Sequence, residues 1–318
     1  MTRGKCWLKS GELTPTSKEG HTAFYHMTPP PPPREMNVAD EEIDAVVTWA
    51  DSTDPAWQAR FEAAVGRPFR TSVRFTPGSA GPETEVCVAL EKIGESLPWI
   101  RAIYVVTQRP QMPSCVNTIP NARVVFHDQI ELPVVFNSCA IETSLHLIPG
   151  LSAKFLYLND DFYVLRPLSH DQFFRHGWMP LVRFDQGVGW DSFGAINRRT
   201  LDAVGLTSMS ASLAHWPYAL THEMMEDMRQ QLGPVWNHTR DCKVRYECGD
   251  GEIAPILAAM ALALSKGMAV DDPHERNLYP DRYFDNAPSW QPTEAMIVIN
   301  ALHEDEGALR WVVGLGGW

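Results

Sequence analysis

The stretch FLYLNDDFYV, residues 155–164, carries three polar residues inside an otherwise apolar run. Its first four residues, Phe155 to Leu158, are typical of a buried strand, and Asn159, Asp160 and Asp161 follow them directly. Burying two adjacent carboxylates costs on the order of several kcal/mol unless a partner or a cation compensates their charge. The stretch therefore predicts a strand whose end either opens to solvent or receives a positive charge.

Further apolar strands and amphipathic helices alternate along the chain around this stretch. Strands are predicted over residues 43–49, 100–107, 122–128, 154–160 and 295–300. Helices are predicted from Asp54-Pro55 to about Val65 and over residues 83–97, 138–148, 221–232 and 251–265. This alternation indicates an α/β fold with a mainly parallel, doubly wound sheet, Rossmann-like or GT-A-like, and flanking helices.

Polar residues follow several of the predicted strands. Asp51 and Asp54 come after the first strand, residues 159–161 after the fourth, and Asn300 ends the last. In an open parallel sheet, ligands bind beyond the carboxyl ends of the strands. The sequence therefore predicts a site at this edge, although each polar residue taken alone is more typical of loop capping.

The composition limits the partners of the chain. Its 318 residues include 39 acidic and 27 basic ones, a formal net charge of −12, which argues against a surface that coats nucleic acid. No apolar run approaches the roughly 20 residues that span a bilayer, so we expect no integral membrane contact. The amino terminus lacks the apolar segment of a secretory signal, and a cytoplasmic location is the default expectation.

Residues 1–40 and residues 41–318 differ in character. The first segment lacks apolar periodicity and contains five consecutive prolines at 29–33, which predicts a disordered tail with a short polyproline helix. This tail is interpreted as a spacer or as a ligand for a proline-binding module. Residues 41–318 are predicted to form a single catalytic α/β domain.

Six cysteines, at positions 6, 87, 115, 139, 242 and 248, are scattered without a Cys-x-x-Cys motif. We expect free thiols in a reducing compartment. The alternative at Cys242 and Cys248 is a disulfide or a metal site.

The Asn-Asp-Asp triplet suits a hard dication. Along an extended chain Asn159 and Asp161 project to one side and Asp160 to the other. Mg²⁺ prefers one or two carboxylates together with diphosphate oxygens and retained waters. One aspartate can therefore hold the metal while the other holds water or an acceptor hydroxyl, as in the metal-binding turn of nucleotide-sugar transferases.

Six stretches of the chain carry a resemblance to a known family. They are IDAVVTWADSTDPAW (43–57), LPWIRAIYVVTQRPQMPSCV (97–116), VVFHDQIELPVVFNSCAIETSLHLIPGLSAKFLYLNDDFYVLRP (124–167), HWPY (215–218) with WNHTRDCKVRYECGDGEI (236–253), and MIVIN (296–300). In this order they resemble the conserved blocks of the Stealth family, most closely in the second block. That family includes bacterial capsule polymerases and the animal N-acetylglucosamine-1-phosphotransferase.

The resemblance implies a transferase that moves a sugar-1-phosphate from a UDP-sugar to an acceptor hydroxyl and releases UMP. The implied partners are a UDP-sugar donor, UDP-N-acetylglucosamine being one candidate, and a glycan or glycoprotein acceptor. The implied cofactor is Mg²⁺ or Mn²⁺. The product would be a glycan phosphodiester, as in capsule or exopolysaccharide synthesis.

The resemblance also implies roles for individual residues. Asp160 and Asp161 would supply metal coordination and the base, and Asn300 would help to hold the metal. Arg245 would clamp phosphate oxygens through its planar fork, and His215 would donate to a phosphate oxygen or relay a proton. The implied substrate-binding residues are Trp49, Asp51, Asp54, Thr107, Gln108, Asn137 and Asn159.

Each role has a structural alternative. His215 could hold a loop, Arg245 could pair with nearby acids such as Glu247, and Trp49 could pack in the core. Asn137 is predicted to cap a helix, with Glu142 one turn in.

Two positions depart from the family pattern. Glu91 stands where an arginine is expected, and Ala301 stands where an aspartate follows Asn300. Diphosphate binding would weaken unless Arg101, Arg109 or Lys92 substitutes. Two other functions therefore stay open: a glycosyltransferase that releases UDP, and a non-catalytic protein that binds sugar nucleotides or glycans.

Overall fold

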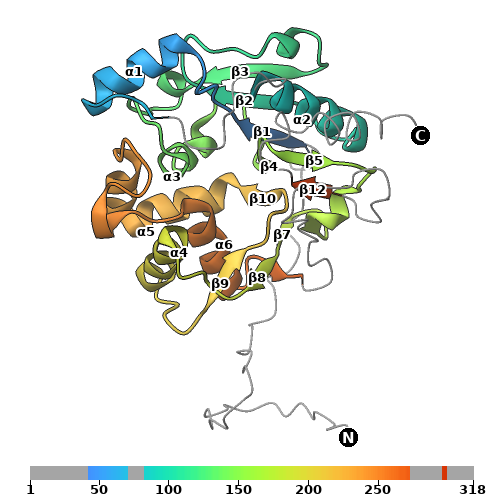
Figure 1. The fold of residues 1–318 in the computed structure, drawn as a ribbon. Coiled ribbons are helices and arrows are strands. Elements are labelled where there is room, and N and C mark those ends of the chain that lie inside the picture. Colours follow the sequence, from blue (N-terminus) through green and yellow to red (C-terminus); the bar gives the residue numbers. More distant parts are fainter. Residues whose placement is uncertain (1–41, 71–81, 273–295, 299–318) are drawn as a thin grey trace, which may run out of the picture.

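The computed structural model describes residues 42–70, 82–272 and 296–298 (Figure 1). The predicted amino-terminal tail, Asn300 and Ala301 lie outside the described residues. The division of the chain at residue 40 stays a prediction.

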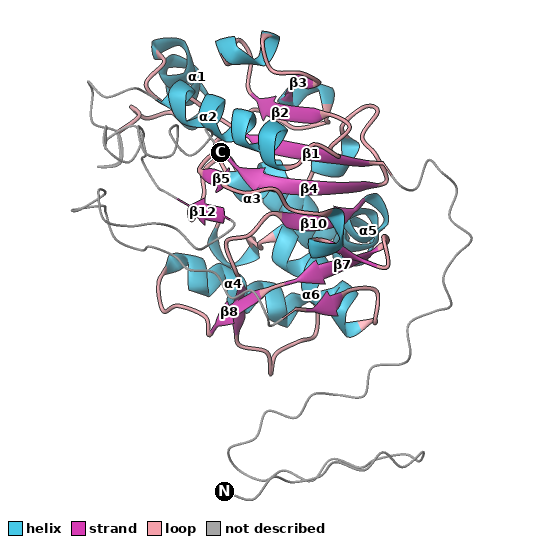
Figure 2. Cartoon of the chain, turned by 90° about the vertical axis from the view of Figure 1, so that its right-hand side faces the viewer, coloured by secondary structure: helices cyan, strands magenta, loops and turns pink. Residues whose placement is uncertain are grey.

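A five-stranded sheet forms the centre of the fold. Its strands are β1 (Ile43–Thr48), β2 (Ile103–Thr107), β3 (Ala122–Phe126), β4 (Lys154–Asn159) and β10 (Tyr218–Thr221). The order is β10-β4-β1-β2-β3, which Figure 2 shows as strands stacked one above another. The first four strands are parallel and β10 runs antiparallel to β4, so the predicted α/β fold with a mainly parallel sheet is confirmed.

The strands are mainly apolar because both faces of the sheet are covered. Successive side chains of a strand project to opposite faces. Val46 and Tyr157 belong to a core cluster that contains residues of helices α5 (His222–Arg240) and α6 (Pro255–Ser265). Val47 and Leu158 belong to a second cluster, which includes three buried residues of α2 (Pro82–Ser96). The sheet is thus sandwiched between helices, and the polar groups of its strands are left to the ends.

Most predicted helices are confirmed, with two differences in length. Helix α1 (Pro55–Val65) begins where predicted, with Asp54 as its cap. The predicted helix 138–148 is a short α3 (Ser138–Glu142) and a 3-10 turn, and the Thr143 hydroxyl bonds to the Ala140 carbonyl where the helix ends. Helix α5 extends past its predicted end at 232, because the chain kinks at Gly233 and then resumes a helix to Arg240.

Several elements, most of them short strands, were not predicted. They are β5 (Phe162–Val164), β6 (Phe174–Arg175), β7 (Met179–Val182), β8 (Phe184–Gln186), α4 (Ser192–Ala203), β9 (Ala211–Leu213) and β11 (Val270–Asp271). Strands of two to four residues are too short to show periodicity. The predicted last strand exists as β12 (Met296–Val298), but it pairs antiparallel with β5 and lies outside the central sheet.

The expectation of free thiols is wrong for four cysteines. Cys87 and Cys115 form one disulfide and Cys242 and Cys248 another, with Cα atoms 5.8 Å apart in each pair. The first pair links α2 to a distant turn, which spacing alone does not reveal; Cys139 is free and buried. Disulfides persist in oxidising compartments, which weighs against the expected cytoplasmic location.

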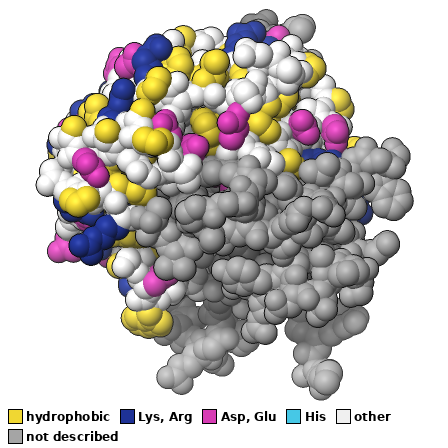
Figure 3. Space-filling view, turned by 45° about the horizontal axis from the view of Figure 1, so that its top comes forward, with side chains coloured by type: hydrophobic (Ala, Val, Ile, Leu, Met, Phe, Trp, Pro, Cys, Tyr) yellow, Lys and Arg dark blue, Asp and Glu magenta, His cyan; other side chains and the backbone are white. Residues whose placement is uncertain are grey.

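The described surface fits the acidic composition. On the face shown in Figure 3, lysine and arginine side chains are scattered among aspartate and glutamate over the part of that face whose residues are described. No helix among the described residues is long and apolar enough to cross a membrane.

The two disulfides should contribute unequally to stability. Their sequence separations are 28 and 6, and a longer closed loop constrains the unfolded chain more. We expect C87S/C115S to lower the free energy of unfolding by about 3.5 kcal/mol and C242S/C248S by about 2 kcal/mol, measured by urea unfolding. If the urea midpoint of unfolding were the same in both variants as in the wild type, neither disulfide would form.

Candidate functional site

The carboxyl ends of β1 and β4 lie side by side at the point where the strand order reverses. Thr48, the last residue of β1, is in register with Asn159, the last residue of β4. From β1 the chain adds β2 and β3 on one side, then crosses to add β4 on the other. In open α/β sheets ligands bind at such a point. The predicted polar edge therefore coincides with the expected ligand crevice.

A tyrosine hydroxyl joins three elements at this edge. Tyr157 donates to Asn159 Oδ1 at 3.0 Å and lies 3.2 Å from the Thr48 hydroxyl. The Tyr157 hydroxyl also approaches Glu142 Oε1, at 3.4 Å. Tyr157 thus ties the predicted binding residue Asn159 to the end of α3.

Glu142 is a functional candidate that the sequence interpretation missed. Burial raises its pKa to about 7, although the charge of Arg245 and the hydrogen bond from Tyr157 act in the opposite direction. A carboxyl group with this pKa exchanges a proton readily near neutral pH, as a general base must. The signal available in the sequence was a glutamate on a predicted helix, directly after the apolar residues Cys139, Ala140 and Ile141.

Asp160 and Asp161 lie just beyond β4, as predicted. Burial raises the pKa of Asp160 well above its ordinary value, and the negative charges of Asp161 and Glu85 raise it further. Glu85 comes from the first turn of α2 and is itself buried. Three carboxyl groups from two elements therefore share one region, and positive charge brought there would be stabilised.

His215 packs against the residue that follows the aspartates. Its ring centroid lies 5.9 Å from that of Phe162, the residue that directly follows Asp161. Phe162 also contacts Tyr218 of β10, with the ring centroids 6.0 Å apart. His215, which is distant in the sequence, therefore contacts the residue that directly follows the acidic pair.

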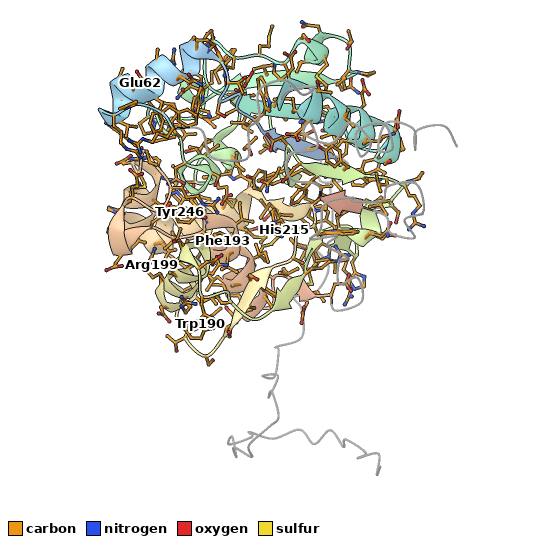
Figure 4. All side chains as sticks on the ribbon, in the orientation of Figure 1. Glu62, Trp190, Phe193, Arg199, His215 and Tyr246 are labelled. Carbon is orange, nitrogen blue, oxygen red and sulfur yellow. A yellow bond between two sulfur atoms is a disulfide. The ribbon has the colours of Figure 1, made fainter. Side chains whose placement is uncertain are left out.

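Arg245 approaches Glu142 on the α3 side of the site. Its guanidinium carbon lies 4.8 Å from the ring centroid of Phe193 and 5.1 Å from that of Tyr246, and its charge acts on Glu142. Figure 4 shows Phe193 and Tyr246 close together. Glu247, the suggested surface partner of Arg245, forms an ion pair with Arg67 instead.

Three predicted binding residues have local structural roles. Asn137 caps α3 by accepting from the Cys139 amide at 3.0 Å, and its amide donates to Glu252. Asp54 caps α1, and Asp51 accepts from the Thr53 amide and hydroxyl. The capping interpretation is confirmed for all three, while their contact with substrate stays a prediction.

Trp49, Thr107 and Gln108 lie at the same edge but are buried. The hydroxyl of Thr107 and both amide atoms of Gln108 have no hydrogen-bond partner among the residues that the structure describes. Their roles in substrate binding stay predictions.

The Glu91 departure does not reach this edge. Glu91 lines a cavity with Ile103 and Asn121, at the amino ends of β2 and β3. Arg101, suggested as a substitute, binds Asp44 at the same opposite edge. The charge reversal therefore leaves the candidate site unchanged.

The other suggested substitutes have partners of their own. Lys92 pairs with Glu95, and Arg109 pairs with Asp128 while stacking on Phe126. Arg245 is the predicted cation that the fold brings to Glu142.

Comparison with known proteins supports the resemblance. Residues 83–181 match the family model of Stealth protein CR2, conserved region 2, which contains Glu85, Glu142, Asp160 and Asp161. The chain carries the second conserved region of the Stealth family. The predicted resemblance to Stealth proteins is thereby confirmed over these residues.

Curated relatives carry related names. Over 214 residues the chain is 34% identical to an exopolysaccharide phosphotransferase of Streptomyces coelicolor, covering 60% of this chain and 22% of the relative. It is 36% identical to the exopolysaccharide phosphotransferase CpsY of Mycobacterium tuberculosis, covering 76% and 47%. The capsular polysaccharide phosphotransferase LcbA of Aeromonas hydrophila is 38% identical, covering 44% and 40%. The chain thus spans less than half the length of these relatives.

The raised pKa of Glu142 predicts a pH-dependent stability. Its protonated form stabilises the fold fully below the unfolded pKa of 4.5, and this contribution is lost as pH rises through about 7. Glu142→Gln keeps an acceptor for Tyr157 but cannot ionise. We expect the variant to match the wild type at pH 4 and to exceed its free energy of unfolding by on the order of 3 kcal/mol at pH 8, by urea unfolding.

Glu62→Gln is the matched control, because Glu62 is exposed on α1 (Figure 4). A stability difference between Glu142→Gln and wild type that stays constant from pH 4 to pH 8 would contradict the assignment.

Proposed function

We propose that this Stealth chain is a phosphotransferase that moves a sugar-1-phosphate from a UDP-sugar to a hydroxyl of a glycan acceptor and releases UMP. The observation that carries the proposal is the convergence of Glu142, Arg245 and the Asp160–Asp161 pair at the switch point of the sheet. The names of the relatives support polysaccharide phosphate transfer as the class of reaction.

The reaction is an attack on phosphorus. The acceptor oxygen forms a bond to the β-phosphorus of the donor, and the bond from that phosphorus to the bridging oxygen of the diphosphate breaks. UMP departs with the bridging oxygen and its electron pair, and the acceptor proton passes to a base. Such transfer depends mainly on positioning and on stabilising charge.

The side chains supply both requirements. Arg245 would grip two phosphate oxygens, because its planar fork suits bidentate contact. Glu142, with a pKa near 7, would accept the proton from the attacking hydroxyl. This differs from the expectation that one of the aspartates is the base. His215, beside Phe162, would donate to a phosphate oxygen or to the departing UMP.

Asp160 and Asp161 suit a dication. Burial and the negative charges of Asp161 and Glu85 disfavour the charged form of Asp160, and Mg²⁺ or Mn²⁺ bound there would stabilise that form. No group of three His, Cys, Asp or Glu side chains within the described residues is arranged to hold a metal ion. Its remaining ligands would be diphosphate oxygens, water and Asn300, the residue expected from the family pattern. A bound dication supplies positive charge against the diphosphate.

The direct test is product analysis. The protein is incubated with Mg²⁺, a glycan acceptor and a panel of UDP-sugars that includes UDP-N-acetylglucosamine, and nucleotides are separated by chromatography. We expect UMP, and its loss on adding EDTA. UDP as the product would identify a glycosyltransferase, and tight UDP-sugar binding without either product would identify a binding protein.

Variants test the assigned roles. We expect Asp161→Ala, His215→Ala and Arg245→Ala each to lower transfer by at least about 10²-fold while circular dichroism stays unchanged, since each removes a charge-stabilising group. Arg229→Ala is the matched control for arginine loss, because Arg229 is exposed on α5 and pairs with Glu226. Unchanged turnover by folded Asp161→Ala protein would refute the role of that carboxylate.

A further inference from the structure

The Cys242–Cys248 disulfide closes a ring of seven residues with Arg245 at its centre. Three chain positions separate Arg245 from each cysteine. Neither cysteine takes part in the proposed reaction. The ring nevertheless determines the position of the Arg245 backbone, and therefore the point from which its side chain extends.

The first half of the ring is attached to two neighbouring elements. The Phe136 amide donates to the Lys243 carbonyl at 2.7 Å, and Phe136 and Val244 form an isolated parallel bridge. The Lys243 ammonium group donates to the Ala64 carbonyl near the end of α1, also at 2.7 Å. The strand of chain that enters the ring is therefore held against the segment that leads into α3.

The second half of the ring is anchored by a buried carboxylate. Glu252 is fully buried, and its Oε2 accepts from the Tyr246 amide at 2.9 Å. Its Oε1 accepts from the side-chain amide of Asn137 at 2.8 Å, the same residue that caps α3. Glu252 thus connects the backbone next to Arg245 with the helix that carries Glu142.

The backbone inside the ring is strained. Tyr246 has a φ of 69°, a left-handed conformation that side chains other than glycine adopt at a cost. Such a conformation persists only where surrounding structure imposes it. Here the disulfide on one side and the Glu252 hydrogen bond on the other impose it, and this geometry brings the Tyr246 ring against the Arg245 guanidinium.

We propose that Cys242 and Cys248 are positioning residues, whose disulfide holds the backbone of Arg245 so that its guanidinium faces Glu142 and the donor diphosphate. This rests on the proposed function, since Arg245 there binds phosphate. With the disulfide open, the backbone of the ring gains conformational freedom. The Arg245 guanidinium then loses its contacts with the Phe193 and Tyr246 rings for much of the time. We expect the fold to remain, because the two core clusters that cover the central sheet contain none of residues 242–248.

Transfer by cysteine variants tests the proposal. We expect C242S/C248S to lower kcat/KM for the UDP-sugar about 10-fold or more, with C87S/C115S within about threefold of wild type at a temperature where both are folded. In an Arg245→Ala background, C242S/C248S should cause no further loss, because the group it positions is gone. Transfer by C242S/C248S within twofold of wild type, or an equal loss in the Arg245→Ala background, would overturn the proposal.

Reduction repeats the test without a substitution in the ring. In the C87S/C115S protein only the Cys242–Cys248 bond remains of the two disulfides. Dithiothreitol converts it to two thiols and is itself oxidised to a cyclic disulfide. We expect transfer to fall about as far as in C242S/C248S and to return on reoxidation. A reduced protein with undiminished transfer would overturn the proposal, even if C242S/C248S fails to fold.

A readout that needs no activity separates this proposal from the proposed function. Amide exchange of Tyr246, which is bonded to Glu252, should accelerate at least about 10-fold when the disulfide is opened, while amides of β1 and β4 stay protected. If wild-type protein transfers nothing, the proposed function fails, and amide exchange alone tests whether the disulfide holds the backbone of Arg245. Unchanged exchange at Tyr246 would then overturn it.

Discussion

The parallel pairing of β1 with β4 is the constraint on which the rest of the structure depends. It places Thr48 beside Asn159 at the point where the strand order reverses. Because both strands are buried on both faces, their polar groups gather at the ends. The residues that follow β4 are consequently two carboxylates at the edge where ligands are expected, and their charge has to be compensated from outside the sheet.

The basic residues of the candidate site come from parts of the chain distant in sequence. His215 reaches the acidic pair through Phe162, and Arg245 reaches Glu142 from a ring that follows α5. Each is held by aromatic packing or by capping contacts of its own segment. The site therefore has an acidic side that suits a dication and a basic side that suits phosphate oxygens, and in the proposed function the donor diphosphate would lie between them.

The fold and the acidic side could be predicted from the sequence, and the rest could not for identifiable reasons. The strands through 43–49 and 154–160 are long, apolar and flanked by turn residues, so periodicity locates them. Strands β5 to β9 have two to four residues, too few for a pattern. Glu142 was missed because its raised pKa arises from burial, which only the folded chain produces. The Cys87–Cys115 disulfide was missed because its partners meet only in the folded chain, whereas the Cys242–Cys248 disulfide was an alternative that the sequence offered.

The central claim is that Asp160 and Asp161 hold a dication against the diphosphate. Calorimetric titration of UDP into the protein, with and without Mg²⁺, measures this directly. The account predicts that Mg²⁺ tightens UDP binding at least about 10-fold in the wild type and leaves it unchanged in an Asp160→Asn/Asp161→Asn variant. An equal effect of Mg²⁺ on both proteins would contradict the account.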